Sequence, residues 1–260
     1  MLKIQDITVE YEDHVVLEHF NLHMKPGEII SLVGESGSGK TTVIRSILGL
    51  LPGDGRVTAG DILLDEESLL QKTEEQMQEL CATDISMIFQ DSGAMMNPIR
   101  KIGSQFVEYL RYHEKLSKKE AWDRAVKMLE QTRLPDGENI MKSYPFQLSG
   151  GMRQRVGIAM AMSFCPKLLL ADEPTSALDV TTQAQIVRQM LEMHKQYNMG
   201  IILVTHNIGV AAYMSDRIVV MKDGKIVEEG DRDRILNHSS DEYTKSLIEA
   251  IPLMDGEIYV

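Results

Sequence analysis

One glycine-rich segment limits the possible folds of this chain more than any other feature. It consists of Gly34, Glu35, Ser36, Gly37, Ser38, Gly39, Lys40, Thr41 and Thr42. An apolar run of strand length precedes it at 28–33, and a helical pattern follows it from 42 to 50. In this context the glycines let backbone N–H groups converge on phosphate oxygens, and the helix N-terminus adds partial positive charge. The segment therefore predicts a phosphate cradle for a nucleoside triphosphate.

Two side chains at the end of the segment have separate expected roles. The Lys40 ammonium would reach the β- and γ-phosphates, and the Thr41 hydroxyl would coordinate Mg²⁺. A flexible glycine–serine loop is the competing interpretation, and the strand and helix on either side argue against it.

Composition excludes several classes of protein. The 260 residues suffice for one large domain, or for a core with a subdomain. The net charge of −12 argues against a nucleic-acid binder, which usually carries a basic face. No stretch is long and apolar enough to cross a bilayer, and no signal peptide precedes the first strand. We expect a cytosolic chain, or one that reaches a membrane only through a partner.

The pattern of strands and helices divides the chain into a core and an insertion. We expect strands over 3–11, 15–24, 28–33, 61–64 and 85–89, and further strands over 168–171, 201–205 and 218–221. The later runs are almost continuously apolar, as in a parallel sheet buried on both faces. Between the two groups the period is helical from 104 to 131, with a capping box at Ser117 and Glu120. We predict a core over 1–90 and 149–230, a helical subdomain over 91–148 and a short helical tail over 231–260.

Two acids follow an apolar strand in the second half of the chain. The run 168–171 leads directly into Asp172 and Glu173. An acid at the carboxyl end of a parallel strand lies where such sheets bind ligands. We expect Asp172 to hold the Mg²⁺ shell and Glu173 to polarise the attacking water. Acids at a strand exit also occur in ordinary solvated loops, an interpretation that the phosphate cradle makes weaker.

A second candidate anion site opens the helix expected from 149 to 164. Ser149, Gly150 and Gly151 stand at its start, where helix N–H groups can bind an anion. Taken alone, the pattern is better explained by an N-cap serine with turn glycines. However, one nucleotide has no use for two cradles in one chain, unless the second serves a nucleotide held by another subunit. The two cradles together suggest a head-to-tail dimer with ATP between the subunits.

The order of these segments resembles the ATP-binding cassette (ABC) ATPases. The resemblance rests on 34–42, Gln90, 148–155, 168–173, 176–179 and His206, and it covers nearly the whole chain. It implies an α/β fold with a P-loop NTPase core, a mixed sheet, an antiparallel β subdomain and an inserted α-helical subdomain.

The resemblance also implies roles for single residues. Tyr11 matches the aromatic that stacks on adenine, with an ordinary strand tyrosine as the alternative. Gln90 matches the glutamine that contacts Mg²⁺ or the water and senses the transmembrane partner. His206 matches the switch histidine that contacts the γ-phosphate. The segment 176–179 (Ser176, Ala177, Leu178 and Asp179) matches the family's loop that crosses the dimer interface.

Further segments narrow the resemblance to the ATPases of dipeptide, oligopeptide and nickel importers. They are 97–98 with 102–103, 144–156 and 175–185, and the pair Tyr243-Thr244 is similar to that family's tail. The implied function is to couple ATP hydrolysis to uptake of a peptide, nickel or metal-chelate solute. The implied partners are two integral membrane permeases, a second ABC ATPase subunit (a copy or a paralogue) and, indirectly, an extracytoplasmic solute-binding protein. The chain would be peripheral, at the cytoplasmic face of the inner membrane.

Two departures from that family's pattern qualify the resemblance. Many members have a longer C-terminal extension than a chain that stops at Val260, and the shorter length is more similar to the nickel or metallophore branch. Some members have a cysteine cluster that could hold iron–sulfur. Only Cys81 and Cys165 are present here, so we expect no such cluster.

Two alternative functions remain open at this point. One is a soluble ABC ATPase of translation or DNA repair. The translation type usually has two cassettes, and the repair type has a long coiled coil before the signature segment, whereas this chain shows neither feature. The other is a regulatory cassette that binds ATP without turnover. Intact candidate residues argue against it: Lys40, Gln90, Asp172, Glu173 and His206.

The region from Gln90 to Gly103 and the helical insertion are the expected docking surface for a membrane partner. Turn-forming residues over 91–98 suit a mobile connection. Met95 and Met96 are adaptable apolar side chains of a kind favoured where a partner helix docks. Packing inside the insertion is an equally good interpretation of both methionines.

Overall fold

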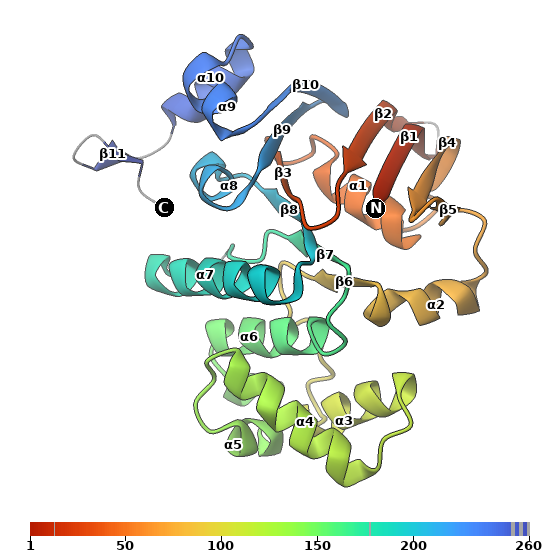
Figure 1. Cartoon of the computed structure of the whole chain (residues 1–260), viewed down its shortest axis with the longest axis vertical. Coiled ribbons are helices and arrows are strands. Elements are labelled where there is room, and N and C mark those ends of the chain that lie inside the picture. The colour runs from red at the N-terminus through yellow and green to blue at the C-terminus, as the bar shows by residue number, and fades with distance from the viewer. Residues whose placement is uncertain (13, 177, 251–252, 255–256, 259–260) are drawn as a thin grey trace. The chain divides into compact units, whose positions relative to one another are not determined.

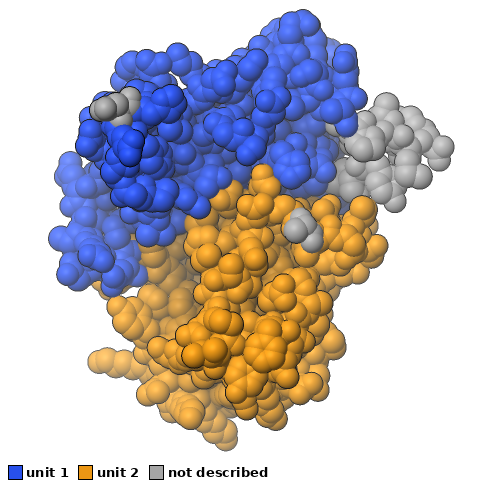
Figure 2. All heavy atoms as spheres, turned by 180° about the vertical axis from the view of Figure 1, so that it is seen from behind, with its two compact units in different colours: residues 1–78, 198–260 blue, residues 79–197 orange. Residues whose placement is uncertain are grey.

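The computed structural model describes residues 1–12, 14–176, 178–250, 253–254 and 257–258. The chain forms two compact units (Figure 2). Unit 1 contains Met1–Gln78 and Asn198–Val260, and unit 2 contains Glu79–Tyr197. Figure 1 labels most of the helices and strands of both units.

Unit 1 begins with an antiparallel sheet. Its strands are β1 (Leu2–Tyr11), β2 (His14–Met24), β4 (Arg56–Leu64) and β5 (Glu67–Ser68), in the spatial order β2-β1-β4-β5. Along β1, Leu2 and Ile4 are buried on alternate positions, and so are Ile7 and Val9, as the period of two predicts. The sheet confirms the antiparallel β subdomain, although β4 begins at Arg56 rather than at 61.

A second sheet in unit 1 positions the glycine-rich segment. β3 (Ile29–Val33) lies between β8 (Gly200–Thr205) and β9 (Arg217–Lys222) and runs parallel to both. β10 (Lys225–Gly230) pairs antiparallel with β9, so the sheet is mixed, as expected. All residues of β3 are buried, which explains the almost continuous apolar run at 28–33. Helix α1 (Lys40–Leu48) follows the glycine-rich turn.

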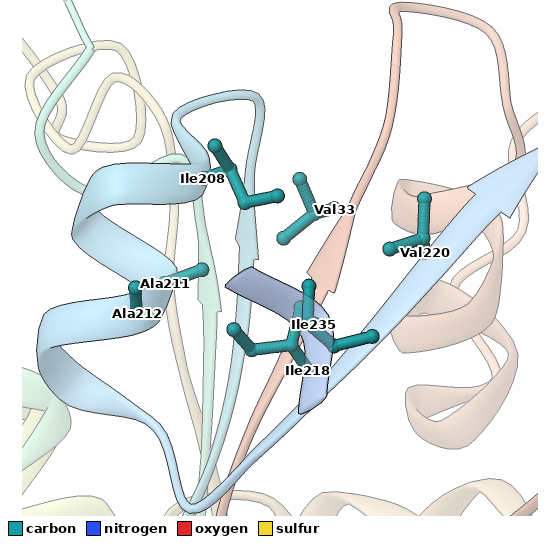
Figure 3. Packing of buried hydrophobic residues seen from close by; sticks show 7 residues of the cluster. All are labelled: Val33, Ile208, Ala211, Ala212, Ile218, Val220 and Ile235. Carbon is teal, nitrogen blue, oxygen red and sulfur yellow. The ribbon is translucent and has the colours of Figure 1, made fainter. Parts of the chain in front are cut away.

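An apolar cluster joins this sheet to the C-terminal helices (Figure 3). Seven buried residues from strands β3 and β9 and from helices α8 (Ile208–Met214) and α9 (Arg232–His238) form it: Val33, Ile208, Ala211, Ala212, Ile218, Val220 and Ile235. Tyr243 and Leu247 of α10 (Glu242–Glu249) pack against the cluster. The C-terminal helices therefore share the core of the unit that carries the phosphate cradle. A short antiparallel pair, β11 (Leu253–Met254) and β12 (Glu257–Ile258), follows them and was not predicted.

Unit 2 combines one parallel strand pair with several helices. The strands are β6 (Ile85–Ile88) and β7 (Leu168–Asp172). Helix α2 (Glu74–Thr83) precedes them in the chain, and the division between the two units falls within it. The helices are α3 (Ile102–His113), α4 (Lys118–Gln131), α5 (Gly137–Lys142), the 3₁₀ helix η1 (Pro145–Gln147), α6 (Gly150–Ala161) and α7 (Val180–Tyr197). Every element within 91–148 is helical.

The capping box at the start of α4 is confirmed. The Ser117 hydroxyl accepts a hydrogen bond from the Glu120 N–H at 3.2 Å, and the Glu120 carboxylate accepts one from the Ser117 N–H at 2.8 Å. Two backbone N–H groups of the first turn, which lack partners inside a helix, are thereby satisfied.

Candidate nucleotide site

In unit 1, two neighbouring strands bring the phosphate loop (34–42) and a histidine to one edge of the sheet. Val33 ends β3 and pairs with Thr205, which ends the parallel strand β8. Gly34 and His206 follow these two residues directly, and carboxyl ends of parallel strands meet at the ligand-binding edge. His206 is exposed, and Asn207 beside it caps α8 by accepting hydrogen bonds from two backbone N–H groups. The local backbone of the histidine is therefore well fixed.

The backbone of the phosphate loop has the geometry of a cradle. A Cβ on Gly34 would lie 2.1 Å from the Met221 carbonyl oxygen, so only glycine fits there. Gly39, at the N-cap of α1, has a φ of 96° in the left-handed region that glycine favours. Among the described residues no side chain caps α1. The N–H groups of the first turn therefore face the space beyond the helix, the arrangement that binds phosphate.

The Lys40 side chain folds back over the loop that precedes it. Its ammonium donates to the carbonyl oxygens of Gly34 at 2.8 Å and Glu35 at 2.6 Å, and to the Ser38 hydroxyl at 3.1 Å. The residue is 5% exposed. A buried cation needs such oxygen partners, and phosphate oxygens are stronger acceptors of the same kind. The cradle and its cation together fit the phosphates of a nucleotide.

Tyr11 lies at the tip of the hairpin formed by β1 and β2, where it pairs with His14. The same hairpin reaches the phosphate loop, because a Cβ on Gly39 would come within 2.7 Å of the Leu17 Cδ2. The Tyr11 ring itself lies against Gly55, where a Cβ would be 2.5 Å from the ring Cε1. The ring is thus packed on a turn, and its stacking on adenine stays a prediction.

In unit 2, a second parallel pair brings the candidate acids and the glutamine to one edge. Ile88 ends β6 and pairs with Ala171 of β7. Asp172 ends β7 and is 7% exposed, Glu173 follows it and is half-buried, and Gln90 lies two residues beyond β6 and is exposed. The same relation between strands that links Gly34 to His206 therefore recurs here.

The backbone of Glu173 is held in an unusual conformation. Its φ is 44°, in the left-handed region that residues with a side chain rarely adopt. The Glu173 carbonyl accepts hydrogen bonds from the Ser176 N–H at 3.1 Å and the Ser176 hydroxyl at 3.0 Å, which close the turn. Strained backbone of this kind is concentrated at functional sites. The turn thereby fixes the position from which the Glu173 side chain leaves the backbone.

The candidate metal ligands are of the type that Mg²⁺ prefers. Thr41, Gln90 and Asp172 offer hydroxyl, amide and carboxylate oxygens. Among the described residues, no group of three or more His, Cys, Asp or Glu side chains could hold a metal by itself. Mg²⁺ usually binds through one or two protein oxygens together with substrate phosphates. Each of these oxygens is therefore of a type that fits Mg²⁺ arriving with a nucleotide.

Ser149 and the two glycines form an exposed helix start. The Ser149 hydroxyl accepts from the Met152 N–H at 3.2 Å and caps α6, as the simpler interpretation expected. Ser149 and Gly150 are exposed, whereas Gly151 is half-buried. In the neighbouring segment the Asp179 carboxylate accepts from the Thr182 N–H at 3.0 Å, while Ala177 lies outside the described residues. The start of α6 is thus both capped and open to a partner.

Gln154 is a site residue that the sequence reasoning missed. Its side-chain amide donates to the Phe89 carbonyl at 3.2 Å and accepts from the Ser92 N–H at 3.4 Å, so it brackets Gln90. Ser92 can approach α6 because Gly157 has no Cβ; one built there would lie 2.5 Å from the Ser92 Cβ. A glycine inside a predicted helix was the available signal of this close contact. Gln154 thereby links the start of α6 to the Gln90 loop.

The two candidate docking methionines differ. Met95 is 60% exposed, whereas Met96 is 7% exposed and belongs to the core. The expectation that both face a partner is therefore wrong for Met96, whose alternative interpretation as a packing residue holds. Ile99, which the sequence reasoning did not single out, is 81% exposed. Met95 and Ile99 are the large apolar side chains that are exposed between Gln90 and Gly103.

The sequence profile of the ABC transporter family matches residues 17–176. The chain belongs to the ABC transporter family. Two bacterial relatives support this membership. The oligopeptide transport ATP-binding protein AppD of Bacillus subtilis is 44% identical over 239 residues, which cover 92% of this chain and 73% of AppD. The dipeptide transport ATP-binding protein DppD of Haemophilus influenzae is 40% identical over 256 residues, which cover 97% of this chain and 78% of DppD.

Solved ABC structures have the same fold. A dimeric post-hydrolysis structure of the ATP-binding cassette MJ0796, bound to ADP and Pi, superposes with a TM-score of 0.80 at 29% identity. The match covers 89% of this chain and 99% of that cassette. The fold class and the assignment as an ATP-binding ATPase subunit of an ABC transporter are therefore confirmed. The relatives do not favour the soluble alternative of translation or DNA repair.

Proposed function

We propose that the chain powers a solute importer by hydrolysing ATP held on the phosphate loop. The observation that carries this proposal is the Val33–Thr205 pair, which sets the loop and His206 at one sheet edge. In this proposal Lys40 and the loop bind the phosphates, Tyr11 stacks on adenine and His206 contacts the γ-phosphate. Glu173 orients and polarises the attacking water.

Magnesium completes the proposed site. Thr41, Gln90 and Asp172 would hold it, and it would neutralise charge on the phosphates. Hydroxyl, amide and carboxylate oxygens support this choice over a softer metal.

The proposed working form is a head-to-tail dimer. Ser149, Gly150 and Gly151 would contact the nucleotide bound by the phosphate loop of a second ATPase subunit, either a copy or a paralogue. Support comes from the exposed start of α6, whose N–H groups suit an anion. The dimeric state of the MJ0796 cassette is a further argument.

The proposed partners are two membrane permeases, served from outside by a solute-binding protein. Docking through the Gln90–Gly103 region is supported by the exposed Met95 and Ile99. A groove of about 710 Å³ in unit 2 adjoins that region, lined in part by Lys101, Val107 and Trp122. Among the described residues no helix has the length and apolar character needed to cross a membrane. We propose a peripheral position at the cytoplasmic face of the inner membrane.

The proposed solute is a peptide, with nickel or a metal chelate second. The names of AppD and DppD favour peptides. The proposed domains remain 1–90 with 149–230, 91–148 and 231–260.

Co-expression with the two permeases tests the proposal. We expect a membrane complex that contains this chain and takes up labelled di- or oligopeptides only when ATP is hydrolysed. Uptake should disappear with Lys40→Ala and persist with Lys195→Ala, which removes a lysine from α7. Failure to co-purify with permeases, together with steady ATP turnover in solution, would favour the soluble alternative.

A further inference from the structure

The phosphate loop receives a hydrogen bond from the far end of the chain. The backbone N–H of Glu35, the second residue of the loop, donates to the phenol oxygen of Tyr243 at 2.8 Å. Tyr243 lies in the first turn of α10, 208 residues later in the sequence. The contact places a C-terminal helix in direct touch with the backbone that binds phosphate.

Other contacts support the loop from the same side. The N–H of Gly224, in the turn between β9 and β10, donates to the Ser38 carbonyl at 3.2 Å. The Lys222 ammonium lies 4.9 Å from the centre of the Tyr243 ring, within range of a cation–π attraction. The loop backbone is therefore held at both Glu35 and Ser38 by residues 222–243.

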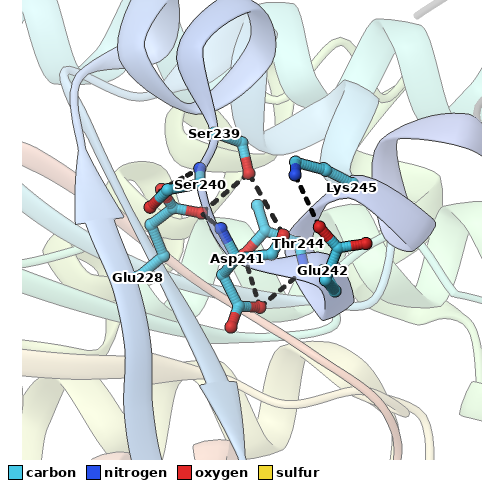
Figure 4. Close-up of polar contacts among 7 residues, drawn as sticks. All are labelled: Glu228, Ser239, Ser240, Asp241, Glu242, Thr244 and Lys245. Atoms are coloured by element: carbon cyan, nitrogen blue, oxygen red, sulfur yellow. Dashed lines mark hydrogen bonds and ion pairs between the residues drawn. The ribbon is translucent and has the colours of Figure 1, made fainter.

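A buried carboxylate fixes the position of α10 (Figure 4). Glu228 of β10 is 7% exposed. It accepts hydrogen bonds from the Ser239 hydroxyl at 2.8 Å and the Ser240 N–H at 2.9 Å, in the segment that leads into α10. Asp241 then caps α10 by accepting from the Thr244 N–H at 3.0 Å. These hydrogen bonds and the apolar cluster together hold α10 in place, and the helix in turn fixes the position of the Tyr243 hydroxyl.

We propose that Tyr243 is a positioning residue for the phosphate loop, so that the C-terminal helix α10 sets the affinity for nucleotide phosphates. The inference rests on the proposed function of the loop. Without the Tyr243 hydroxyl the Glu35 N–H loses its acceptor, and the loop samples more conformations. Nucleotide binding must then order the loop again, which weakens affinity.

Removal of one hydroxyl tests this role. Tyr243→Phe keeps the ring, its packing and its contact with Lys222. Tyr213→Phe is the matched control, since it removes a hydroxyl from an exposed tyrosine of α8 in the same unit. We expect the Kd of MgATP to rise roughly 3–10-fold in Tyr243→Phe, as loss of one hydrogen bond predicts. The melting temperature of the nucleotide-free chain should stay close to that of the control.

Hydrogen exchange measures the contact without nucleotide. The Glu35 amide should exchange roughly tenfold faster in Tyr243→Phe than in Tyr213→Phe. In the assembled transporter, the KM for ATP should rise while kcat changes less than twofold.

The outcomes separate this inference from the proposed function. A wild-type chain that binds no MgATP would overturn both. Wild-type binding that Tyr243→Phe leaves unchanged, or an unchanged Glu35 exchange rate, would overturn the role of Tyr243 alone. A fall in melting temperature without a change in Kd would make Tyr243 a structural residue only.

Discussion

The Ser176 hydroxyl donates a hydrogen bond to the backbone carbonyl of Glu173, with 3.0 Å between the two oxygens. The bond holds the left-handed backbone of Glu173 independently of its carboxylate. A change confined to the end of the Glu173 side chain therefore leaves the turn intact.

We expect Glu173→Gln to bind ATP normally and to lose turnover by about 10²–10⁴-fold, because an amide cannot accept a proton from water. ATP-bound dimers should accumulate. Phosphate release measures the loss of turnover, and size-exclusion chromatography detects the dimers. Glu130→Gln, at an exposed position of α4, is the control. Turnover close to that of the control would remove Glu173 from the catalytic role.

Mixed dimers test whether each nucleotide site uses two chains. Gly150→Asp is preferable to a substitution of Gly151, because it leaves the local packing undisturbed. A Cβ on Gly150 would have its nearest neighbour at 3.8 Å, whereas one on Gly151 would have it at 2.9 Å. When one subunit carries Gly150→Asp and the other Lys40→Ala, both lesions fall at one composite site and the other site stays intact. We expect roughly half of the wild-type ATP turnover at most, but clearly more than background.

The second arrangement places both lesions in one subunit beside a wild-type partner. Each composite site then carries one lesion, and turnover should vanish. Differently tagged subunits isolate the two mixed dimers. The reverse pattern, with turnover retained only when one subunit carries both lesions, would mean that each site is contained within one chain.

Met95 and Met96 should respond differently to the same substitution. Met95→Gln changes an exposed side chain and should reduce uptake by the assembled transporter while the ATPase activity of the isolated chain persists. Met96→Gln buries an amide in the core and should lower the free energy of unfolding by about 1–3 kcal/mol. Uptake assays and urea denaturation distinguish the two. Normal uptake with Met95→Gln would argue against docking at this residue.

The Glu228 carboxylate makes the free energy of unfolding depend on pH. Burial alone would raise the pKa of its carboxyl, but hydrogen bonds from Ser240, Ser239, Thr244 and Asp241 outweigh it and lower the pKa from 4.5 to about 2. The lower folded-state pKa means that the stabilisation is complete above pH 4.5 and is lost as the pH falls toward 2. We expect Glu228→Gln to cost about 1–2 kcal/mol at pH 7 and much less near pH 3. Urea denaturation at both pH values checks this, and a cost independent of pH would contradict it.

Features that depend on residues close together in the chain were predicted well from the sequence. The capping box of α4 depends on residues three positions apart, and β3 is apolar because both of its faces are buried. The start of β4 was missed because residues 56–60 are mostly exposed and show no apolar period. Met95 and Met96 are the same residue type in adjacent positions, so no pattern could separate the buried one from the exposed one.

The sequence predicted which candidate site residues lie together when the order of the parallel strands alone determines their placement. Loops that follow parallel strands share an edge, which accounts for Gly34 with His206 and for Gln90 with Glu173. The Gln154 amide was missed because its acceptor lies 65 residues away at Phe89 and depends on the packing of α6. Such contacts exist only after the tertiary structure is formed.

The hydrogen bond between Glu35 and Tyr243 also has a consequence for synthesis. The phosphate loop leaves the ribosome early, but its acceptor is made 208 residues later. At about 5–20 residues per second, the loop waits roughly 10–40 s for this partner. Nascent chains of this subunit should therefore bind ATP with full affinity only after α10 has left the ribosome, and until then chaperones meet a phosphate loop whose Glu35 N–H lacks the Tyr243 acceptor.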